Sequence, residues 1–323
     1  MAAKANLKVI SVVLAILVGC EIAVRLGERS FSFNIRHIRS IPSLADKIDH
    51  ETGISVLFLG NSLITYGIDP IVFLDEMRAN GVGPLQFERV APDASSIREW
   101  RYAFKHFFLD RGHNPDALVV NFAAGHLEDQ QKIHPSDLAA FYTSFNDIPY
   151  IFAEDVQSFG DRTEFLLSHV FRLFAYREAI SKRILDLVVP NYRSAMTQIN
   201  TKMRDGSSNE HIPTYRTLER FSAESLRRGV RLILVAMPLQ HPYRLDPRLP
   251  DKARELGITL IDARNVQGLT ASQFIDPMHM DRAGAILYTR TLAGLLVDPL
   301  NAVRQAEHRT PPRLTSAVPS PDL

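Results

Sequence analysis

The sequence predicts an α/β fold in which helices cover both faces of a parallel β-sheet. Short apolar runs of strand length recur along the chain, and stretches with helical spacing of apolar residues lie between them. Such alternation favours parallel strands joined by crossover helices. With 323 residues, 46% of them hydrophobic and 23% charged, the chain can bury a full core.

Five apolar runs are the expected strands of this sheet. Gly60 ends the first run, and a glycine there can take a backbone conformation that other residues avoid. Ligands of parallel sheets bind beyond the carboxyl ends of the strands, so the chemistry is expected at that edge. The runs are Ile54–Leu59, Leu85–Val90, Ala117–Phe122, Val230–Met237 and Ile258–Ile261.

Helical patterns and one long insertion separate these strands. Between the third and fourth strands, roughly from residue 124 to 229, the chain is too long for one crossover helix. We therefore expect a helical insertion at about 128–228 within a domain spanning 53–300. The expected helices are Thr163–Leu187, Thr217–Arg228 and the terminal Ala283–Leu296. In the second of these, Leu218, Phe221 and Leu226 are expected to share one face. A polar patch covers Arg204–Glu210.

Residues 1–26 are predicted to be a membrane anchor or signal segment. Lys4 and Lys8 precede an uncharged apolar run, Val9–Cys20, which continues past Glu21 to Val24. This length is just sufficient to span a bilayer. An uncleaved anchor, a cleaved secretory signal and a buried N-terminal helix all stay open at this point.

The only cysteine adds another alternative. Residues 17–20 resemble a bacterial lipobox, in which Cys20 would be lipidated and become the new N-terminus. Basic residues lie on both sides of the apolar run, so the positive-inside rule does not fix the orientation. Glu21 and Arg25 are four residues apart and are expected to pair on a helix near the membrane interface.

Two further segments have a polar composition. Residues 27–52 are mixed and contain serine and proline around Ser40–Ser43, which predicts a linker with some helix. Residues 301–323 contain four prolines and few apolar side chains, which predicts a disordered tail.

Composition also argues against several classes of function. The net charge is +1 and the Lys and Arg residues are scattered, so no nucleic-acid partner is expected. A single cysteine excludes an internal disulfide and a multi-cysteine metal site. Because paired-histidine motifs and glycine-rich phosphate loops are both absent from the sequence, we expect no metal and no cofactor.

Ser62 is the first candidate for chemistry. It follows the first predicted strand, at the edge where ligands bind, and has Gly60 two residues before it. The G-x-S-x-G turn of α/β-hydrolases would need a second glycine at residue 64, which is Ile64. A serine at a strand-to-helix turn is also a common helix N-cap, so Ser62 alone does not identify an active site.

A second candidate pair, Asp276 and His279, precedes the terminal helix. A nucleophilic serine needs a base to take its proton, and the base needs a carboxylate to fix its tautomer. An aspartate three residues before a histidine can supply both groups from one loop. Asp276-Pro277 is also an ordinary turn sequence, and Asp281 is a possible helix cap.

Together the two motifs resemble a known family. Gly-Asn-Ser at 60–62 and Asp-x-x-His at 276–279 resemble the first and last blocks of the SGNH (GDSL-like) hydrolases, a resemblance that covers roughly 53–298 apart from the insertion. The resemblance implies a flavodoxin-like three-layer α/β/α sandwich with strand order 2-1-3-4-5. It also implies that Ser62 is the nucleophile, His279 the general base and Asp276 its orienting acid.

The middle blocks of the family match less closely. The family usually has a glycine whose backbone N–H helps to bind the oxyanion, and Asp93 occupies that place here. In the next block His126 takes the place of an asparagine donor and Ala124 that of a glycine. A neutral imidazole N–H can still donate such a hydrogen bond, although His126 can equally be a structural loop residue.

The resemblance implies a membrane-tethered bacterial serine esterase with its catalytic domain outside the cytoplasm, in the periplasm. Its expected partners are the membrane and an acylated carbohydrate or other ester, with O-acyl groups such as acetyl removed from an envelope or secreted polysaccharide. Two alternatives stay open: an O-acyltransferase with the same triad, and a catalytically inactive scaffold in polysaccharide assembly. Tethering through a lipidated Cys20 is the alternative to a single-pass anchor.

Overall fold

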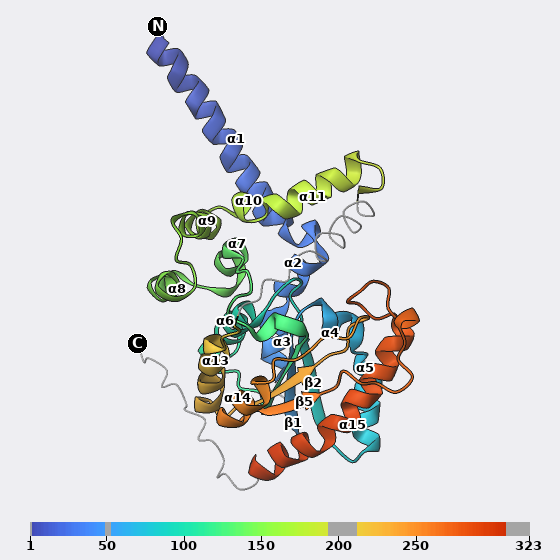
Figure 1. The fold of residues 1–323 in the computed structure, drawn as a ribbon. Helices are drawn as coiled ribbons and strands as arrows, with labels where there is room; N and C mark the ends of the chain where they lie inside the picture. The colour runs from blue at the N-terminus through green and yellow to red at the C-terminus, as the bar shows by residue number, and fades with distance from the viewer. Residues whose placement is uncertain (1, 49–52, 193–211, 308–323) are drawn as a thin grey trace, which may run out of the picture.

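The computed structural model, which describes residues 2–48, 53–192 and 212–307, contains a five-stranded parallel sheet (Figure 1). Its strand order, β2-β1-β3-β4-β5, is the order that the resemblance implies, so the predicted fold class is confirmed. The first three strands have the predicted bounds. The fourth is one residue shorter than predicted at each end, and the fifth begins and ends one residue later than predicted. The strands are β1 (Ile54–Leu59), β2 (Leu85–Val90), β3 (Ala117–Phe122), β4 (Arg231–Ala236) and β5 (Thr259–Asp262).

The two central strands form the middle of the core. Every residue of β1 and β3 is buried, because helices cover both faces of the sheet and leave these strands no solvated side. In the parallel register, Leu59 of β1 lies opposite Val90 of β2 and Val120 of β3. The carboxyl ends of neighbouring strands therefore meet at one edge of the sheet.

Two groups of helices make the outer layers. On one face, α4 (Ser62–Gly67), α5 (Pro70–Ala79) and α15 (Arg282–Glu307) enclose a core cluster that includes Phe58, Phe73 and Tyr288. On the other face lie α3 (Ile41–Ile48), α6 (Ile97–Phe107), α13 (Arg216–Arg227) and α14 (Leu249–Glu255), with Trp100 and Phe221 among the buried side chains. The result is a three-layer α/β/α sandwich.

The predicted linker at 27–52 is largely part of the packed fold. Helices α2 (Phe33–Ile38) and α3 place five apolar side chains in the core of the α6 face. These side chains recur every three or four residues, which is the spacing of one helix face, and the intervening Arg, Ser and Pro residues hide that pattern. They are Ile35, Ile38, Ile41, Ala45 and Ile48. Residues 49–52 lie outside the described part of the chain.

The N-terminal apolar run is one long helix, α1 (Ala2–Phe31), which projects from the rest of the chain with the N-terminus at its far end (Figure 1). Its segment Asn6–Phe31 is long and apolar enough to cross a membrane, and almost none of it is buried. A signal sequence has the same length and composition. The expected pairing of Glu21 with Arg25 is confirmed, with Arg25 Nε 2.7 Å from a Glu21 oxygen.

The insertion between β3 and β4 is helical, as predicted. It contains α7 (Pro135–Asp137), α8 (Ile148–Glu154), α9 (Phe159–Val170), α10 (Arg172–Ala175) and α11 (Arg177–Val188). The predicted single stretch Thr163–Leu187 is thus divided among three helices. Residues 193–211, which include the polar patch Arg204–Glu210, lie outside the described residues.

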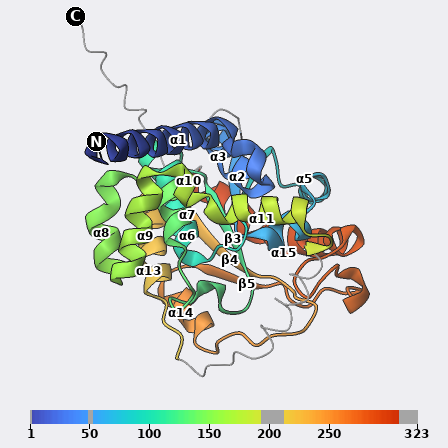
Figure 2. The ribbon, with the colours of Figure 1, turned by 90° about the horizontal axis from the view of Figure 1, so that it is seen from above.

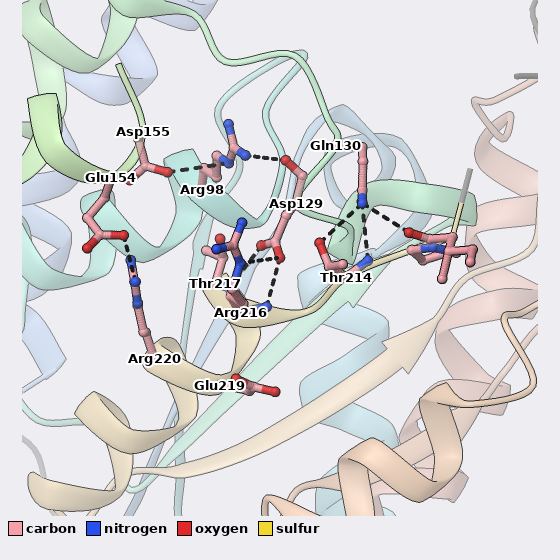
Figure 3. A network of polar contacts seen from close by, with 12 residues as sticks. Arg98, Asp129, Gln130, Glu154, Asp155, Thr214, Arg216, Thr217, Glu219 and Arg220 are labelled. Atoms are coloured by element: carbon pink, nitrogen blue, oxygen red, sulfur yellow. Dashed lines mark hydrogen bonds and ion pairs between the residues drawn. The ribbon is translucent and has the colours of Figure 1, made fainter. Parts of the chain in front are cut away.

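A polar network joins the two ends of the insertion (Figure 3). The Asp129 carboxylate accepts hydrogen bonds from the backbone N–H groups of Arg216 and Thr217, at 2.8 and 2.9 Å, and so caps α13. Arg98 of α6 donates to the Asp129 carbonyl, and the Gln130 amide donates to Thr214 Oγ1 at 3.1 Å. The insertion therefore returns to the sheet near residue 214.

That return corrects the predicted end of the insertion at about 228. Helix α13 belongs to the sandwich, since its Leu218 and Phe221 are fully buried against the α6 face. Leu226 was expected on the same buried face, but it is 65% exposed. It lies five residues after Phe221, which turns it away from the core on a helix.

The terminal helix is longer than predicted and includes the first residues of the segment predicted as a tail. α15 continues to Glu307 although Pro299 lies within it. Leu300 and Val303 are buried and extend the face formed by Leu292 and Leu296, which explains why the helix continues. The remainder of the predicted tail, 308–323, lies outside the described residues.

Candidate active site

Ser62 lies directly beyond the carboxyl end of β1, as the first residue of α4. The N-cap of α4 is Asn61, whose Oδ1 accepts the Leu63 N–H at 3.1 Å. The Ser62 hydroxyl is therefore not used for capping. Within the described chain no partner is found for the Ser62 backbone N–H, as is usual for the first N–H of a helix.

Gly60 is required here for a different reason from the one expected. Its φ is not in the left-handed region. A Cβ at residue 60 would instead lie 2.9 Å from the Asn121 carbonyl oxygen of β3 and 3.2 Å from a methyl group of Ile64. The absence of a side chain lets the turn after β1 pass close to the neighbouring strand.

The loop before α15 holds Asp276 and His279 in a compact turn. Asp276 Oδ1 accepts the backbone N–H groups of Met278 and His279, at 2.8 and 2.9 Å. Its other oxygen, Oδ2, lies 2.7 Å from His279 Nδ1. Asp281 caps α15 by accepting the Gly284 N–H at 2.8 Å. Asp276 is thus both a turn residue and the partner of the imidazole.

The structure brings all three predicted triad residues together. His279 Nε2 lies 2.8 Å from Ser62 Oγ, although the two residues are 217 positions apart in the sequence. Because Asp276 accepts at Nδ1, that nitrogen carries the proton in a neutral imidazole and Nε2 is left to accept from the hydroxyl. This hydrogen-bond line from carboxylate to imidazole to hydroxyl is the arrangement needed for nucleophilic catalysis.

Electrostatics keep the Asp276 carboxylate ionised. Burial acts to raise its pKa, but the hydrogen bonds from the His279 imidazole and from the Met278 and His279 N–H groups outweigh that effect and lower it. The side chains of His279 and Asp276 are 21% and 33% exposed. The Asp276 carboxylate is therefore ionised, and both side chains can be reached from solvent.

Sequence reasoning missed Tyr66 as a neighbour of the site. Its ring centroid lies 4.7 Å from that of His279, tilted by 50°, and the side chain is 46% exposed. Tyr66 follows Ser62 by four residues on α4, so it shares the helix face of the nucleophile. That spacing was the available signal. The ring restricts one side of the imidazole and offers an apolar surface beside the reacting atoms.

The Asp93 backbone N–H, predicted as an oxyanion donor, already has an acceptor. It donates to Asn34 Oδ1 of α2 at 2.9 Å, and two residues earlier the Ala91 N–H donates to His37 Nε2, also at 2.9 Å. Burial raises the pKa of the Asp93 carboxyl, and the nearby His279 offsets this only in part. In this conformation Asp93 does not present a free donor to the site.

His126 has the tautomer that oxyanion binding would need. Its Nδ1 accepts the Ala123 N–H at 3.3 Å, so the ring proton of a neutral His126 is on Nε2. Ala124, two residues before His126, has a φ of 48°, in the left-handed region that non-glycine residues rarely adopt. Trp100 contacts the His126 ring edge-on at 6.1 Å between centroids.

Asn61 joins the loops that follow β1, β2 and β3. Its side chain is buried, and Nδ2 donates to the Ser95 carbonyl at 3.1 Å and lies 3.4 Å from His126 Nδ1. The same side chain also caps α4 by accepting the Leu63 N–H, so this single amide fixes the positions of three loops at the sheet edge. A change at Asn61 is therefore expected to disturb Ser62 and His126 together.

A cavity of about 640 Å³ adjoins the loop that contains Asp93 and Ala94. Residues 30–36 form one wall and the insertion forms the other. Cationic and anionic side chains both line it, including Arg36, Arg177, Lys182, Glu164 and Glu178. A polar ligand with many hydroxyl groups would find both donors and acceptors in this space.

No group of three or more His, Cys, Asp or Glu side chains in the described part of the chain could hold a metal ion.

No family model matches the sequence, and no curated protein matches it. Solved structures give weak matches. They include the lipase/acylhydrolase from Enterococcus faecalis (13% identity, 76% of this chain and 96% of that chain, TM-score 0.37) and a GDSL-like lipase from Bacteroides thetaiotaomicron (10% identity, 83% and 99%, TM-score 0.38). An acetyl xylan esterase matches at 10% identity over 75% of this chain and 100% of that chain, with a TM-score of 0.37. At these values the matches carry no conclusion about activity or substrate.

Proposed function

We propose that the chain is an SGNH-type serine esterase in which Ser62, His279 and Asp276 act as a catalytic triad. The observation that carries this proposal is the continuous line from Asp276 Oδ2 to His279 Nδ1, at 2.7 Å, and from His279 Nε2 to Ser62 Oγ, at 2.8 Å. Each distance lies within the range for a strong hydrogen bond. The line is also partly open to solvent, so an ester can reach it.

The geometry supports acyl transfer through an acyl-enzyme. Ser62 Oγ attacks the ester carbonyl while His279 Nε2 takes the hydroxyl proton, and the Asp276 carboxylate stabilises the resulting imidazolium. His279 then returns the proton to the departing alcohol oxygen, which leaves Ser62 acylated. Water attacks this acyl group, again losing a proton to His279, and the carboxylic acid leaves as the Ser62 hydroxyl is restored.

The donors that we propose for the oxyanion on the carbonyl oxygen are the Ser62 N–H and the His126 imidazole. The Ser62 N–H is the unpaired first N–H of α4, and His126 Nε2 carries the ring proton on the adjacent loop. The Asp93 N–H contributes only if it leaves Asn34. We therefore expect a working esterase with less oxyanion stabilisation than a site in which the Asp93 N–H also contributes.

For the substrate we propose O-acyl groups, such as acetyl, on an envelope or secreted polysaccharide. The cavity beside Asp93 supports this because charged, hydroxyl and apolar side chains line it together, and such a lining can bind both the hydroxyl groups and the apolar faces of a sugar. Acetate release from O-acetylated polysaccharide, compared with release from long-chain p-nitrophenyl esters, tests the substrate class. Preference for the long-chain esters would contradict it.

An O-acyltransferase with the same triad is the first alternative. Transfer requires that water be kept from the acyl-enzyme. The exposure of His279 and Asp276 favours hydrolysis in the conformation described. Measuring free acyl release against transfer to an added sugar acceptor separates the two reactions, since a transferase would acylate the acceptor faster than it releases acid.

A catalytically inactive scaffold is the second alternative. It is favoured by the occupied Asp93 N–H and by a histidine at the place of the usual asparagine donor. Reaction with a fluorophosphonate probe decides this point, because the probe labels only an activated serine. Wild-type protein that stays unlabelled would support the scaffold.

We further propose that α1 is a retained single-pass anchor in a bacterial cell membrane and that the esterase domain lies outside the cytoplasm. The exposed apolar surface of Asn6–Phe31 supports a membrane-spanning role. Intact mass of the membrane-extracted protein distinguishes a retained helix from cleavage before Cys20 with lipidation. Protease treatment of spheroplasts tests orientation, and a domain protected until lysis would place it in the cytoplasm.

A further inference from the structure

The helices of the insertion carry apolar side chains that no other part of the described chain covers. On α9, Phe159, Leu166 and Val170 are 87%, 42% and 47% exposed. These residues recur at intervals of seven and four, so they share one face of the helix. On α11, Leu187 and Val188 are 77% and 71% exposed. Exposed apolar faces on two helices of one insertion favour a contact with a protein or a membrane.

The opposite side of α9 packs against the rest of the insertion. Ser168, nine residues after Phe159 and so about 180° from it around the helix, is fully buried and donates to Ser136 Oγ of α7 at 3.1 Å. Figure 1 shows α7 and α8 below α9, and the N-terminus of α1 above it. The apolar face of α9 therefore looks toward the side to which α1 projects.

Helix α11 has the same division between its faces. Its charged residues Lys182, Arg183 and Asp186 line the cavity beside Asp93. Ile184, Leu187 and Val188 are displaced from them around the helix and are exposed. Seen from above, α9, α10 and α11 lie over the sheet beside α1 (Figure 2). The insertion thus presents a polar side to the cavity and an apolar side to the surroundings.

Hydrogen bonds attach helices α9 and α10 to α1 near Glu21 and Arg25. The Glu21 carboxylate accepts the backbone N–H groups of Arg172 and Leu173, both at 2.8 Å. Arg25 donates to the Val170 carbonyl at 2.9 Å. The junction between α9 and α10 is therefore held at the position where the uncharged run of α1 ends. A membrane crossed by α1 would have its interface at that level.

The length of the membrane-crossing helix also places the insertion at the membrane. Asn6–Phe31 contains 26 residues, and a helix needs about 20 residues to cross the hydrocarbon core of a bilayer. A span that begins near Asn6 therefore ends near Arg25. The junction between α9 and α10, which is bound to Glu21 and Arg25, then lies at the interface.

We infer that the apolar faces of α9 and α11 dock into the interface of the same bilayer that α1 crosses. The face defined by Phe159, Leu166, Val170, Leu187 and Val188 lies in the membrane plane, below the lipid headgroups. Arg177 of the insertion is paired with Glu164 at 2.9 Å, and we expect apolar burial to supply most of the attraction to the bilayer. Docking rests on the membrane anchor proposed above and is independent of the esterase chemistry.

Nitroxide labels on the full chain in phosphatidylcholine vesicles test this inference. In a Cys20→Ser background, which keeps α1 on the chain, single cysteines at Leu166 and Leu187 report on the docking face. Val13→Cys on α1 is the reference for the bilayer, and Ile71→Cys on α5, 72% exposed, is the matched control for water. Collision rates with oxygen and with a soluble nickel chelate give the depth of each label.

We expect the labels at 166 and 187 to lie about 5–10 Å below the phosphates, the one at 13 to lie deeper, and the one at 71 to remain in water. Labels at 166 and 187 that match the control while 13 is in lipid would overturn docking and leave the anchor. If the labels at 13, 166 and 187 are all in water, both the anchor and the docking are wrong. Labels at 166 and 187 in lipid with 13 in water would also overturn the inference, because α1 would then not cross the bilayer into which these helices dock.

Discussion

The two sides of the candidate active site differ in how their polar groups are used. On the triad side, the Ser62 hydroxyl, the His279 imidazole and the Asp276 carboxylate bind one another in a line of short hydrogen bonds. On the oxyanion side, the Asp93 N–H is bound to Asn34. His126 Nδ1 is bound to the Ala123 N–H, which leaves Nε2 as its donor.

We infer that the triad determines which reaction occurs and that the oxyanion donors determine how fast it occurs. A complete triad supplies the nucleophile and the proton transfers, whereas oxyanion donors lower the barrier of the same step. A chain with an intact triad and a reduced donor set is therefore expected to be a slow esterase rather than an inactive one. Substitutions on each side test this division.

The largest effect after loss of the nucleophile is expected for Asp276→Asn. The amide cannot hold His279 in the tautomer that accepts the Ser62 proton, so turnover should fall by up to about 10⁴-fold. Circular dichroism should show a folded protein, since Asn Oδ1 can still accept the Met278 N–H. Turnover close to wild type would show that the triad side does not drive the reaction.

A smaller effect is expected for His126→Ala on the oxyanion side. Loss of one donor should lower kcat by about 10²–10³-fold with little change in KM. The matched variant His126→Asn keeps a side-chain N–H donor and should recover part of the lost rate. Equal rates in all three proteins would make His126 a structural residue of the loop.

Asn34→Ala should change the rate in the opposite direction. Without Asn34 Oδ1 the Asp93 N–H can turn to the oxyanion, and we expect kcat to rise by less than the 10²-fold that one donor typically supplies. The control His37→Ala removes the acceptor of the Ala91 N–H but leaves Asp93 bound. A fall in kcat for Asn34→Ala alone would mean that Asn34 is needed to shape the loop.

Asp129→Asn should leave the rate per folded molecule unchanged and lower stability. Each Asp129 oxygen accepts one N–H of α13, and an amide can accept only one of them, which should cost about 1–3 kcal/mol. Burial raises the pKa of Asp129, but the hydrogen bonds from Thr217 and Arg216 outweigh this and lower it. The carboxylate therefore stabilises the fold above its unfolded pKa, and this contribution is lost as pH falls through the folded value.

Urea unfolding at several pH values measures this effect. The difference in free energy of unfolding between the wild type and Asp129→Asn should be largest near neutral pH and shrink in acid. A difference that does not depend on pH would show that the Asp129 charge plays no part. A change in kcat would show that the ends of the insertion affect the catalytic site.

The sheet and the triad could be predicted because their signals are local. Each strand is a short apolar run, and its bounds follow from where that run ends. Ser62 and the Asp276–His279 pair lie in two short motifs, and the parallel sheet brings their loops to one edge. Tyr66 could have been found from its four-residue spacing to Ser62.

The remaining features depend on contacts that leave no pattern in the sequence. Asn34 binds the backbone of Asp93 across 59 residues, and any residue can supply an N–H. The apolar spacing of α2 and α3 is interrupted by charged and polar residues, so the segment resembles a linker. Val303 continues the buried face of α15 beyond Pro299, where sequence reasoning expects a helix to end.

Labelling of Ser62 by a fluorophosphonate tests the central claim most directly. The full chain in mild detergent is treated with the probe, and the labelled peptide is identified by mass spectrometry. Ser62→Ala should lose the label, whereas Ser181→Ala, an exposed serine of α11, should keep it. We predict covalent modification at Ser62, slowed strongly in Asp276→Asn. A wild-type protein that remains unlabelled, or one that is labelled equally after Ser62→Ala, would contradict the account.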